Sequence, residues 1–355
     1  MAQQTPNTAA FLPAAGAALV LGERPIPTPG PNELLIRTHA IGINPIDWKR
    51  QAFGIAIPSY PTILGADVAG VVVAVGSDVA SSGLFRLGNR VLGSADAMGS
   101  GNIDHAGFQT YTILSASATA PLPSFLSFTD AATLPTATST PAIALYETLG
   151  LPAPGVPLPA HSRKTGILIW GGASQVGAGT IQIAARQAGL TVFAAASPAH
   201  HARLRELGAT GVVDYRSPTV VEDLLAAAEQ AGVEITLGVD AVSSEQTLKT
   251  TAEVLSRFTT TEKKGRLATV APWPQGLTVP GDGSLEVEWV QGGKIWSDRK
   301  DLGELLFNQL LAGWLERGEF VPGKAKVLEG GLGALQKGLE ELKKGVSGEK
   351  LVVEV

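Results

Sequence analysis

The stretch ILIWGGASQVGAG, residues 167–179, joins two segments of different character. The run that leads into it, KTGILIWGG, has the continuous apolar composition of a buried parallel strand. In the segment that follows, Ile181, Ala184, Ala185 and Ala188 recur at the spacing of one helix face. The glycines between them are therefore predicted to form a turn from a buried strand into a helix.

This turn carries a variant of the pattern G-x-G-x-x-G. Gly172 and Gly177 take the first and last glycine positions, suited to a tight turn and to close helix–strand packing, and Ser174 replaces the middle glycine. The amides and dipole of a helix N-terminus favour a phosphate, and the serine hydroxyl can donate to a phosphate oxygen. The turn is predicted to bind a dinucleotide; the alternative is an ordinary glycine turn.

Around this turn the sequence alternates between strands and helices. Apolar runs such as TVFAAA, EITLGVDAV and GRLATVAP are separated by helical patterns such as HHARLRELGA and EQTLKTTAEVLS. Such a series with short turns predicts a parallel, doubly wound sheet. Residues 130–150 suit one or two helices, with Thr129 or Asp130 as the cap, and residues 301–320 suit a long amphipathic helix.

The N-terminal third has a different texture. Residues 33–43, 67–76, 89–94 and 109–117 are rich in Val, Ile and Thr, are bounded by Gly and Pro, and leave little room for helices. They predict a compact, barrel-like β domain. The tail beyond about Pro322 reads as strand, helix and strand, and we expect it to fold back onto this domain. The predicted domains are 1–128 with 320–355, and 129–319.

The composition excludes several classes of protein. The 355 residues suit about two domains, and a net charge of −5 provides no basic surface for nucleic acid. No apolar run is long enough to span a bilayer, and the N-terminus lacks the pattern of a secretory signal. With no cysteine, neither a disulfide nor a thiolate metal site can form. A cytoplasmic protein is expected.

The end of the second strand of the sheet bears on which dinucleotide is bound. A carboxylate there would bind the ribose 2′-hydroxyl of NAD, but no acid occurs before Glu206, and Tyr215 could lie along the same ribose. NADPH is therefore favoured over NAD. The alternative is that Arg203 and the histidines simply form a solvated helix face. The hydroxyl, imidazole and guanidinium groups in this segment are those of Ser197, His200, His201 and Arg203.

Two further motifs carry a family resemblance. LGADVAGVVVAVGSDV, residues 64–79, and AGFQTY, residues 106–111, resemble signatures of the medium-chain dehydrogenase/reductase superfamily, although Thr110 stands where an acid is common. The resemblance covers nearly the whole chain. It implies an α/β protein with a GroES-like β-barrel domain and a Rossmann domain that has a doubly wound parallel sheet.

The resemblance is to the zinc-free branch of quinone oxidoreductases and enoyl reductases. Zinc alcohol dehydrogenases place a cysteine early and a His-Glu pair in the signature. Here Asn44, in GINPIDWK, and Asp67, in GAD, take ligand positions, and His39 and His105 have no thiolate partner. No metal is expected.

Four stretches are similar to fungal trans-acting enoyl reductases of polyketide synthases, and so to secondary metabolism: NPIDWK, ASPAHH, residues 133–152 and residues 327–352. With Arg203 added from the analysis above, the implied NADP contacts are Ile46, Asp47, Trp48, Lys49, Gly172, Ala173, Ser174, Gln175, Val176, Gly177, Ser197, Pro198, Ala199, His200, Tyr215, Val346 and Ser347. The implied substrate channel comprises Thr136, Ala137, Thr138, Ser139, Thr140, Pro141, Ala142 and Ile143.

The expected chemistry is hydride transfer from NADPH to the C=C of an α,β-unsaturated carbonyl, an enoyl thioester. Lys49 is expected near the nicotinamide ribose or the developing enolate, although an ordinary solvated lysine is the alternative. Asn44 could orient the nicotinamide carboxamide or the substrate carbonyl. Tyr146 is a weaker candidate donor, since a buried tyrosine on a helix is more often part of the core, and water could supply the proton.

Two other functions remain open from the sequence: an NADPH:quinone oxidoreductase, and a structural protein that binds NADPH without turnover. The partners expected are a small enone, enoyl thioester or quinone, with an acyl carrier protein of a polyketide synthase as a further candidate. Neither nucleic acid nor a membrane is expected, and both a monomer and a homodimer are compatible with the sequence.

Overall fold

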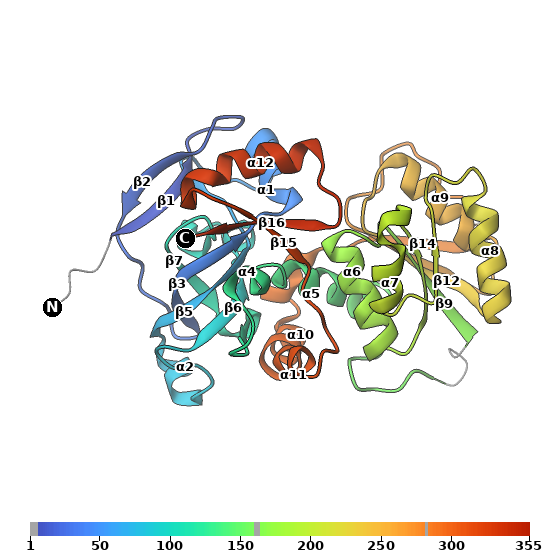
Figure 1. Ribbon diagram of the computed structural model, residues 1–355, viewed down its shortest axis with the longest axis horizontal. Helices are drawn as coiled ribbons and strands as arrows, with labels where there is room; N and C mark the ends of the chain where they lie inside the picture. Colours follow the sequence, from blue (N-terminus) through green and yellow to red (C-terminus); the bar gives the residue numbers. More distant parts are fainter. Residues whose placement is uncertain (1–5, 160–163, 281–282) are drawn as a thin grey trace. The chain divides into compact units, whose positions relative to one another are not determined.

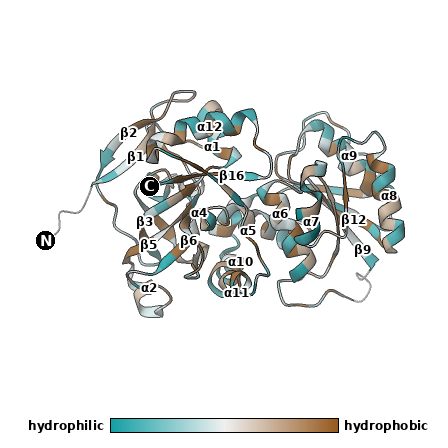
Figure 2. Cartoon of the chain, in the orientation of Figure 1, coloured by the Kyte–Doolittle hydropathy of each residue, from teal (hydrophilic) through white to brown (hydrophobic). Residues whose placement is uncertain are grey.

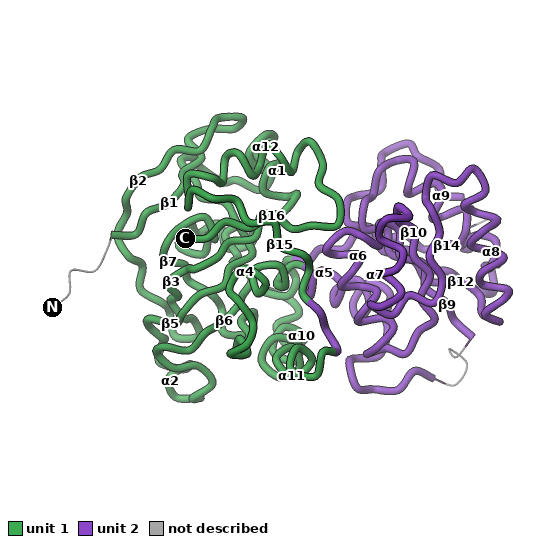
Figure 3. Tube along the Cα trace, viewed as in Figure 1, with its two compact units in different colours: residues 1–136, 293–318, 322–355 green, residues 137–292, 319–321 purple. Residues whose placement is uncertain are grey.

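The computed structural model describes residues 6–159, 164–280 and 283–355. They form two compact units (Figure 3). Unit 1 comprises Met1–Thr136, Gly293–Gly318 and Pro322–Val355, and unit 2 comprises Ala137–Gly292 and Glu319–Val321. The chain passes from unit 1 to unit 2 within helix α5 (Pro135–Ala142).

Residues 293–318 belong to unit 1, whereas the sequence analysis expects them in the Rossmann domain. Side chains of this segment bind backbone carbonyls of the N-terminal part of unit 1. Asn308 Nδ2 donates to the carbonyls of Ala116 and Thr119 at 2.9 and 2.7 Å, and Trp296 Nε1 donates to the Ser94 carbonyl at 3.1 Å. The long helix expected at residues 301–320 is present as α10 (Lys300–Gly303), η8 (Glu304–Leu310) and α11 (Leu311–Glu316).

Unit 1 is built on a largely antiparallel sheet, visible in Figure 1. Its strand order is β15-β16-β3-β5-β6-β8, with β7 also paired to β3, and a smaller sheet has the order β2-β1-β4. The bounds are β1 Asn7–Leu12, β2 Val20–Arg24, β3 Glu33–Gly42, β4 Thr62–Ile63, β5 Asp67–Val75, β6 Arg90–Ser94, β7 Tyr111–Ser115, β8 Thr119–Pro121, β15 Lys324–Leu328 and β16 Glu349–Glu354. The tail thus joins the sheet of the N-terminal segment, since β16 is antiparallel to β3.

Helix α1 (Pro45–Phe53) departs from the all-strand texture expected of the N-terminal region. Asn44 is its N-cap, Pro45 takes the first position, and Gly54 ends it with φ at 67°. The other helices of unit 1 are α2 (Ser77–Ser82), α3 (Ala97–Ser100), α4 (Phe128–Ala131) and α12 (Leu335–Lys344). Ser127, and neither Thr129 nor Asp130, caps α4, because its hydroxyl accepts the N–H of Asp130 at 3.0 Å.

Unit 2 contains a parallel sheet with the order β11-β10-β9-β12-β13-β14. The third, second and first strands of the unit thus precede the fourth, fifth and sixth, which is the doubly wound Rossmann order. The strands are β9 Thr165–Trp170, β10 Thr191–Ala195, β11 Gly211–Val213, β12 Glu234–Asp240, β13 Gly265–Thr269 and β14 Leu285–Trp289. Its helices include α6 (Gln175–Gln182), α7 (His201–Glu206), α8 (Val220–Ala231) and α9 (Glu245–Ser256).

Each unit has its own apolar core. In unit 1, Ile36, Ile41 and Val68 of the sheet pack with Leu335 and Leu339 of α12. Figure 2 colours the other residues of α12 largely as hydrophilic, which is the pattern of a helix covering a sheet with one face. In unit 2, the strands of the parallel sheet pack against α8 and α9. In the described ranges every helix is too short or too polar to cross a bilayer.

Candidate functional site

Three turns of unit 2 lie side by side at the carboxyl edge of its parallel sheet. In the register of the sheet, Ala195 is the partner of both Trp170 and Val213, so β9, β10 and β11 end at the same level. The turns that follow these strands therefore start together. They carry most of the predicted cofactor contacts of unit 2: Gly172, Ala173, Ser174, Gln175, Val176, Gly177, Ser197, Pro198, Ala199, His200 and Tyr215.

The first turn is held in shape by backbone contacts that require glycine. Its left-handed residue is Gly171, with φ at 75°, so Gly171 and not Gly172 serves the tight turn. A Cβ at Gly172 would lie 3.1 Å from the side chains of Ala194 and Leu204, so this glycine permits close packing beneath the loop. A Cβ at Gly177 would lie 2.3 Å from the Gly171 carbonyl oxygen, which is the close approach of helix to strand expected there.

Ser174 caps helix α6 at this turn. Its Oγ accepts the N–H of Gly177 at 3.0 Å, and its own N–H donates to the Gly171 carbonyl at 2.9 Å. Because the serine oxygen is the acceptor, its hydroxyl hydrogen can still donate to a ligand. The amides of Gln175 and Val176 belong to the first helical turn, where no preceding carbonyl is in reach within the helix. Together these donors suit a phosphate at the start of α6.

The second turn carries the hydroxyl and imidazole groups predicted for the adenosine ribose. Ser197 precedes the short helix Pro198–His200, and His200 N–H donates to the Ser197 carbonyl at 3.0 Å. His201 is used locally, since its Nε2 lies 2.9 Å from the Ala196 carbonyl. Arg203 follows on α7 and is half-buried.

The third turn adds two charged residues that the sequence analysis did not identify. Asp214 follows β11, and its Oδ1 accepts from Arg216 Nε at 3.2 Å. The backbone and side-chain N–H groups of Arg216 lower the pKa of Asp214, so the carboxylate is ionised and paired. Arg216 also lies over the ring of Tyr215, 5.4 Å from its centroid, and Tyr215 is exposed. In the sequence, these two residues flank Tyr215 in the run VVDYR, and of this run only Tyr215 is among the predicted cofactor contacts.

In unit 1, a buried polar cluster joins segments that are far apart in the sequence. Lys350 Nζ donates to Asn44 Oδ1 at 2.5 Å and to Asp67 Oδ2 at 2.6 Å. Asp67 Oδ1 accepts from the hydroxyl of Thr136 at 2.6 Å and from its backbone N–H at 3.1 Å. Asn44 and Lys350 are each 3% exposed, and Asp67 is fully buried. We refer to these four residues as the Lys350 cluster.

The Asn44 amide nitrogen is the one incomplete part of the Lys350 cluster. Asn44 Nδ2 is enclosed, and no acceptor for it exists among the described residues. Tyr146, on the π-helical segment η3 (Ile143–Thr148) of unit 2, has the same property, since its hydroxyl is buried and lacks a partner in the described part of the chain. Burial raises the pKa of Tyr146, so the phenol stays protonated and can donate.

Asp47, predicted to contact NADP, has a structural use in unit 1. Its carboxylate accepts the N–H of Asn44 at 2.8 Å and so closes the first turn of α1. Burial raises the pKa of Asp47 to about 6, although the Asn44 N–H, Arg50 and Lys350 act in the opposite direction. Only 1% of Asp47 is exposed, so the structure supports a role for its carboxyl group in closing the first turn of α1.

Trp48 and Lys49 lie beside helix α12. Lys49 Nζ is 5.9 Å from the centroid of the Trp48 ring, and Lys343 Nζ of α12 is at the same distance from it. Trp48 and Val346 both pack against the core of unit 1, and Ile46 and Ser347 are neighbours in sequence of these two. The predicted contacts of unit 1 thus come from the start of helix α1 and from the segment that follows α12.

Most of the residues predicted to line the substrate channel are buried in or next to helix α5. Ala137, Thr138, Ser139, Pro141, Ala142 and Ile143 are buried, whereas Thr136 and Thr140 are half-buried. The Thr136 hydroxyl donates a hydrogen bond to the Asp67 carboxylate. Thr140 lies against Gly292, where a Cβ would come within 3.1 Å of its hydroxyl oxygen.

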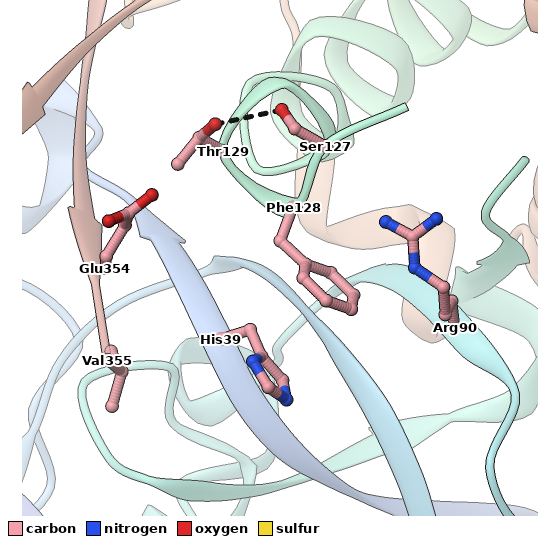
Figure 4. A pocket seen from close by; sticks show the side chains of 7 residues that line it. All are labelled: His39, Arg90, Ser127, Phe128, Thr129, Glu354 and Val355. Atoms are coloured by element: carbon pink, nitrogen blue, oxygen red, sulfur yellow. Dashed lines mark hydrogen bonds between the residues drawn. The ribbon is translucent and has the colours of Figure 1, made fainter. Parts of the chain in front are cut away.

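A separate hollow of about 400 Å³ occurs in unit 1 and is shown in Figure 4. His39 stacks on Phe128 there, with ring centroids 4.6 Å apart, and Arg90 lies over the other side of the same ring at 4.5 Å. Burial and the charges of Arg37 and Arg90 lower the pKa of His39. The guanidinium of Arg90 donates to the backbone carbonyls of Pro123, Ser124 and Leu126. None of the predicted site residues lines this hollow.

The residues at the zinc-ligand positions do not suit a metal. Asn44 and Asp67 both accept hydrogen bonds from the Lys350 ammonium, so a cation of the protein already lies between them. His105 pairs with Glu33 at 3.0 Å, and His39 stacks on Phe128. In the described ranges no group of three or more His, Asp or Glu side chains could hold a metal ion.

Comparison with known proteins agrees with this architecture. Residues 30–124 match the alcohol dehydrogenase GroES-like domain. The chain is 35% identical to the trans-enoyl reductase himH of Aspergillus japonicus over 98% of its own length and 97% of that protein. Among solved structures it is similar to an alcohol dehydrogenase superfamily protein of Novosphingobium aromaticivorans, with 25% identity, a TM-score of 0.78, and coverage of 98% of this chain and 99% of that one.

A second solved structure is that of the mycobacterial protein Rv1454c complexed with NADPH. It has 21% identity and a TM-score of 0.73, and the match covers 98% of this chain and all of that chain. At this identity the likeness concerns the fold. The strand order of unit 2, the GroES-like match and the full-length relative agree with one another. This chain belongs to the zinc-free medium-chain dehydrogenase/reductase family of oxidoreductases, together with the fungal trans-enoyl reductases.

Proposed function

We propose that this protein is an NADPH-dependent reductase that transfers a hydride to the C=C of an α,β-unsaturated carbonyl compound, an enoyl thioester. The observation that carries the proposal is the serine-capped turn after β9, where the Ser174 hydroxyl and the first amides of α6 suit a diphosphate. The relative himH, named a trans-enoyl reductase, supports the reaction type. The cofactor supplies the hydride, and the protein supplies binding, orientation and electrostatics.

The choice of NADPH over NADH rests on the turn after β10. No carboxylate follows β10 before Glu206, and the acid of the next turn, Asp214, is paired with Arg216. His200 adds an imidazole and Arg203 a guanidinium near Ser197, which suits a 2′-phosphate. The NADPH complex of the structurally similar Rv1454c supports the same choice.

Two buried donors suit the carbonyl side of the reaction. Hydride addition to the β-carbon develops negative charge on the carbonyl oxygen, which a preorganised donor stabilises. Asn44 Nδ2 and the Tyr146 hydroxyl are donors that have no partner among the described residues. Lys49 is the cation proposed for the nicotinamide ribose or the enolate, and Thr136 to Ile143 form the proposed acyl channel.

The test follows NADPH consumption at 340 nm with enoyl thioesters of pantetheine, the same acyl groups on a carrier protein, simple enones, and quinones. We expect oxidation with the enoyl thioesters, and faster turnover with NADPH than with NADH. Turnover with quinones alone would make the protein a quinone oxidoreductase. Stoichiometric NADPH binding without oxidation of any acceptor would make it a non-catalytic NADPH-binding protein. Faster turnover of an acyl group on the carrier protein than on pantetheine would identify an acyl carrier protein as a partner.

Lys49 and Lys343 provide a matched pair of variants, because both ammonium groups lie 5.9 Å from the centroid of the Trp48 ring. Lys49→Ala is expected to raise the KM for NADPH or lower kcat by roughly tenfold, the effect of losing one charge-assisted hydrogen bond. Lys343→Ala, which removes the other cation from the same indole, should leave both constants near the wild-type values. Equal behaviour of the two variants would remove Lys49 from the site.

A further inference from the structure

The Lys350 cluster places a buried ammonium between the two residues that stand at the zinc-ligand positions of the sequence. Asn44 and Asp67 take the ligand positions in the sequence, and both accept from Lys350 Nζ, at 2.5 and 2.6 Å. Lys350 lies on β16, 283 residues beyond Asp67, and is 3% exposed. An isolated buried charge is strongly unfavourable, so the pairing of this lysine with Asp67 is a condition for its burial.

The ammonium determines which way the Asn44 carboxamide is turned. A lysine has three donors and no acceptor, so the Asn44 atom 2.5 Å from it must be the oxygen. The amide nitrogen is then directed away from Lys350. Asn44 is 3% exposed, and no described residue accepts from this nitrogen. A buried donor without an acceptor is costly and calls for an acceptor supplied from elsewhere.

The position of Asp67 is fixed from its other side. Its Oδ1 accepts both the hydroxyl and the backbone N–H of Thr136, at the start of α5. These two hydrogen bonds from Thr136 hold the Asp67 carboxylate in its orientation toward Lys350. Asn44 is fixed in turn as the N-cap of α1, because its N–H donates to Asp47. The orientation of the Asn44 amide thus depends on the Lys350 side chain.

We propose that Lys350 is a positioning residue whose ammonium joins Asn44 and Asp67, and that it holds Asn44 with Nδ2 ready to donate to a carbonyl oxygen. This inference rests on the proposed reductase function, which supplies two such oxygens. One is the carbonyl of the substrate, which becomes an enolate oxygen on hydride addition. The other is the carboxamide of the nicotinamide ring. The chemistry recognised is the same, and the experiment distinguishes the two sources.

The experiment is a double-mutant cycle in the full-length protein with Lys350→Met, Asn44→Ala and the two combined. Lys324→Met is the control, because Lys324, on the neighbouring strand β15, forms an exposed ion pair with Glu349 of β16. For each variant we would measure the NADPH dissociation constant by fluorescence, and kcat and KM with an acceptor that the wild type reduces. Thermal melting of each variant reports its folding.

If Nδ2 serves the substrate oxygen, Lys350→Met and Asn44→Ala should each lower kcat by roughly 100-fold, with the NADPH dissociation constant unchanged. If it serves the nicotinamide carboxamide, each should weaken NADPH binding by roughly tenfold. In both cases the combined variant should be no worse than Asn44→Ala, because Lys350 acts through Asn44. Losses that multiply, or variants that melt earlier but keep both constants, would overturn the proposal.

Lys350→Met leaves the Asp67 carboxylate buried without its partner and can fail to fold. Lys350→Met combined with Asp67→Asn removes both charges and is expected to fold and show the same loss as Asn44→Ala. Elemental analysis of the wild type is expected to find no stoichiometric zinc, and stoichiometric zinc would refute the role of the ammonium. A wild type that reduces no acceptor would instead overturn the proposed function, and the NADPH-binding measurements would still test Lys350.

Discussion

Gly177 lies where helix α6 passes closest to the end of strand β9. A Cβ there would come within 2.3 Å of the Gly171 carbonyl oxygen, which is backbone and cannot move aside without opening the turn. Gly177→Ala is therefore expected to lower the free energy of unfolding by roughly 1 to 3 kcal/mol and to weaken NADPH binding. The control is Gly333→Ala, since no heavy atom lies within 4 Å of a Cβ at that glycine. Equal melting temperatures and NADPH affinities for the two variants would contradict this account.

Asp47 gives the protein a pH dependence of defined sign. Burial raises its pKa to about 6 in the folded state, against about 3.9 in an unfolded chain. Between these values the folded protein keeps a proton that the unfolded chain has lost. The contribution of Asp47 to stability is therefore greatest below about pH 4 and declines as the pH rises through 6.

Asp47→Asn removes this titration while keeping an oxygen to accept the Asn44 N–H. The variant is expected to gain on the wild type by roughly 2 kcal/mol in the free energy of unfolding at pH 7.5, with the difference vanishing near pH 4. Urea unfolding at several pH values measures it. Asp301→Asn is the control with the opposite trend, because Arg299 lowers the pKa of Asp301, so that this carboxylate stabilises the fold at high pH. If the difference in the free energy of unfolding between Asp47→Asn and the wild type does not change with pH, the raised pKa of Asp47 is refuted.

At the scale of elements, the turn after β10 and helix α7 (His201–Glu206) are proposed to set the preference for NADPH. Arg203 is half-buried on α7, whereas Arg205, two residues later, is exposed. Arg203→Ala is expected to raise the KM for NADPH by roughly tenfold without changing that for NADH, because only NADPH has a 2′-phosphate. Arg205→Ala should change neither value. A parallel rise for both cofactors would assign Arg203 a structural role.

The elements that the sequence predicts well are those with a strong local pattern. The strands at β3, β5, β6 and β7 and the alternation of unit 2 follow from apolar periodicity, and the doubly wound sheet is confirmed. Helix α1 is not predicted, although Asn44 and Pro45 are helix-start signals, because the surrounding strands leave little room for a helix. Strand β14 is not among the expected strands, although the alternation of apolar and polar residues in LEVEW is typical of a strand at the edge of a sheet.

The Lys350 cluster could not have been predicted from spacing. It joins Asn44, Asp67 and Lys350 across 306 and 283 positions, and a lysine in the strand EKLVVE is ordinarily solvated. Its burial depends on the antiparallel pairing of β16 with β3, which is a tertiary property. The residues of the glycine motif lie in the turn that follows β9, whereas the burial of Lys350 follows only from the folded structure.

At the scale of the whole molecule, unit 1 is completed only when the last residues of the chain are present. Strand β16 pairs with β3 through Val352 and Val353, and the Ile43 N–H donates to the Leu351 carbonyl at 2.9 Å. The side chains of Leu351, Val352 and Val353 are fully buried in this unit. The first and last segments of the chain thus form one sheet, so neither segment is expected to fold without the other.

A chain that ends after Lys344 lacks β16 and therefore both the sheet pairing and Lys350. Each of the three buried side chains contributes about 1.5 to 3 kcal/mol, which together approach the 5 to 15 kcal/mol that stabilises a typical domain. The truncated protein is expected to lose the cooperative thermal transition of unit 1 and to aggregate, as monitored by circular dichroism and gel filtration. Removal of Val355 alone deletes the hydrogen bond from its N–H to the His39 carbonyl. It should leave the melting temperature within a few degrees of the wild type. A soluble truncated chain with an unchanged melting curve would mean that residues 6–136 and 293–318 fold without the C-terminal strand, and that the Lys350 cluster is dispensable for the fold.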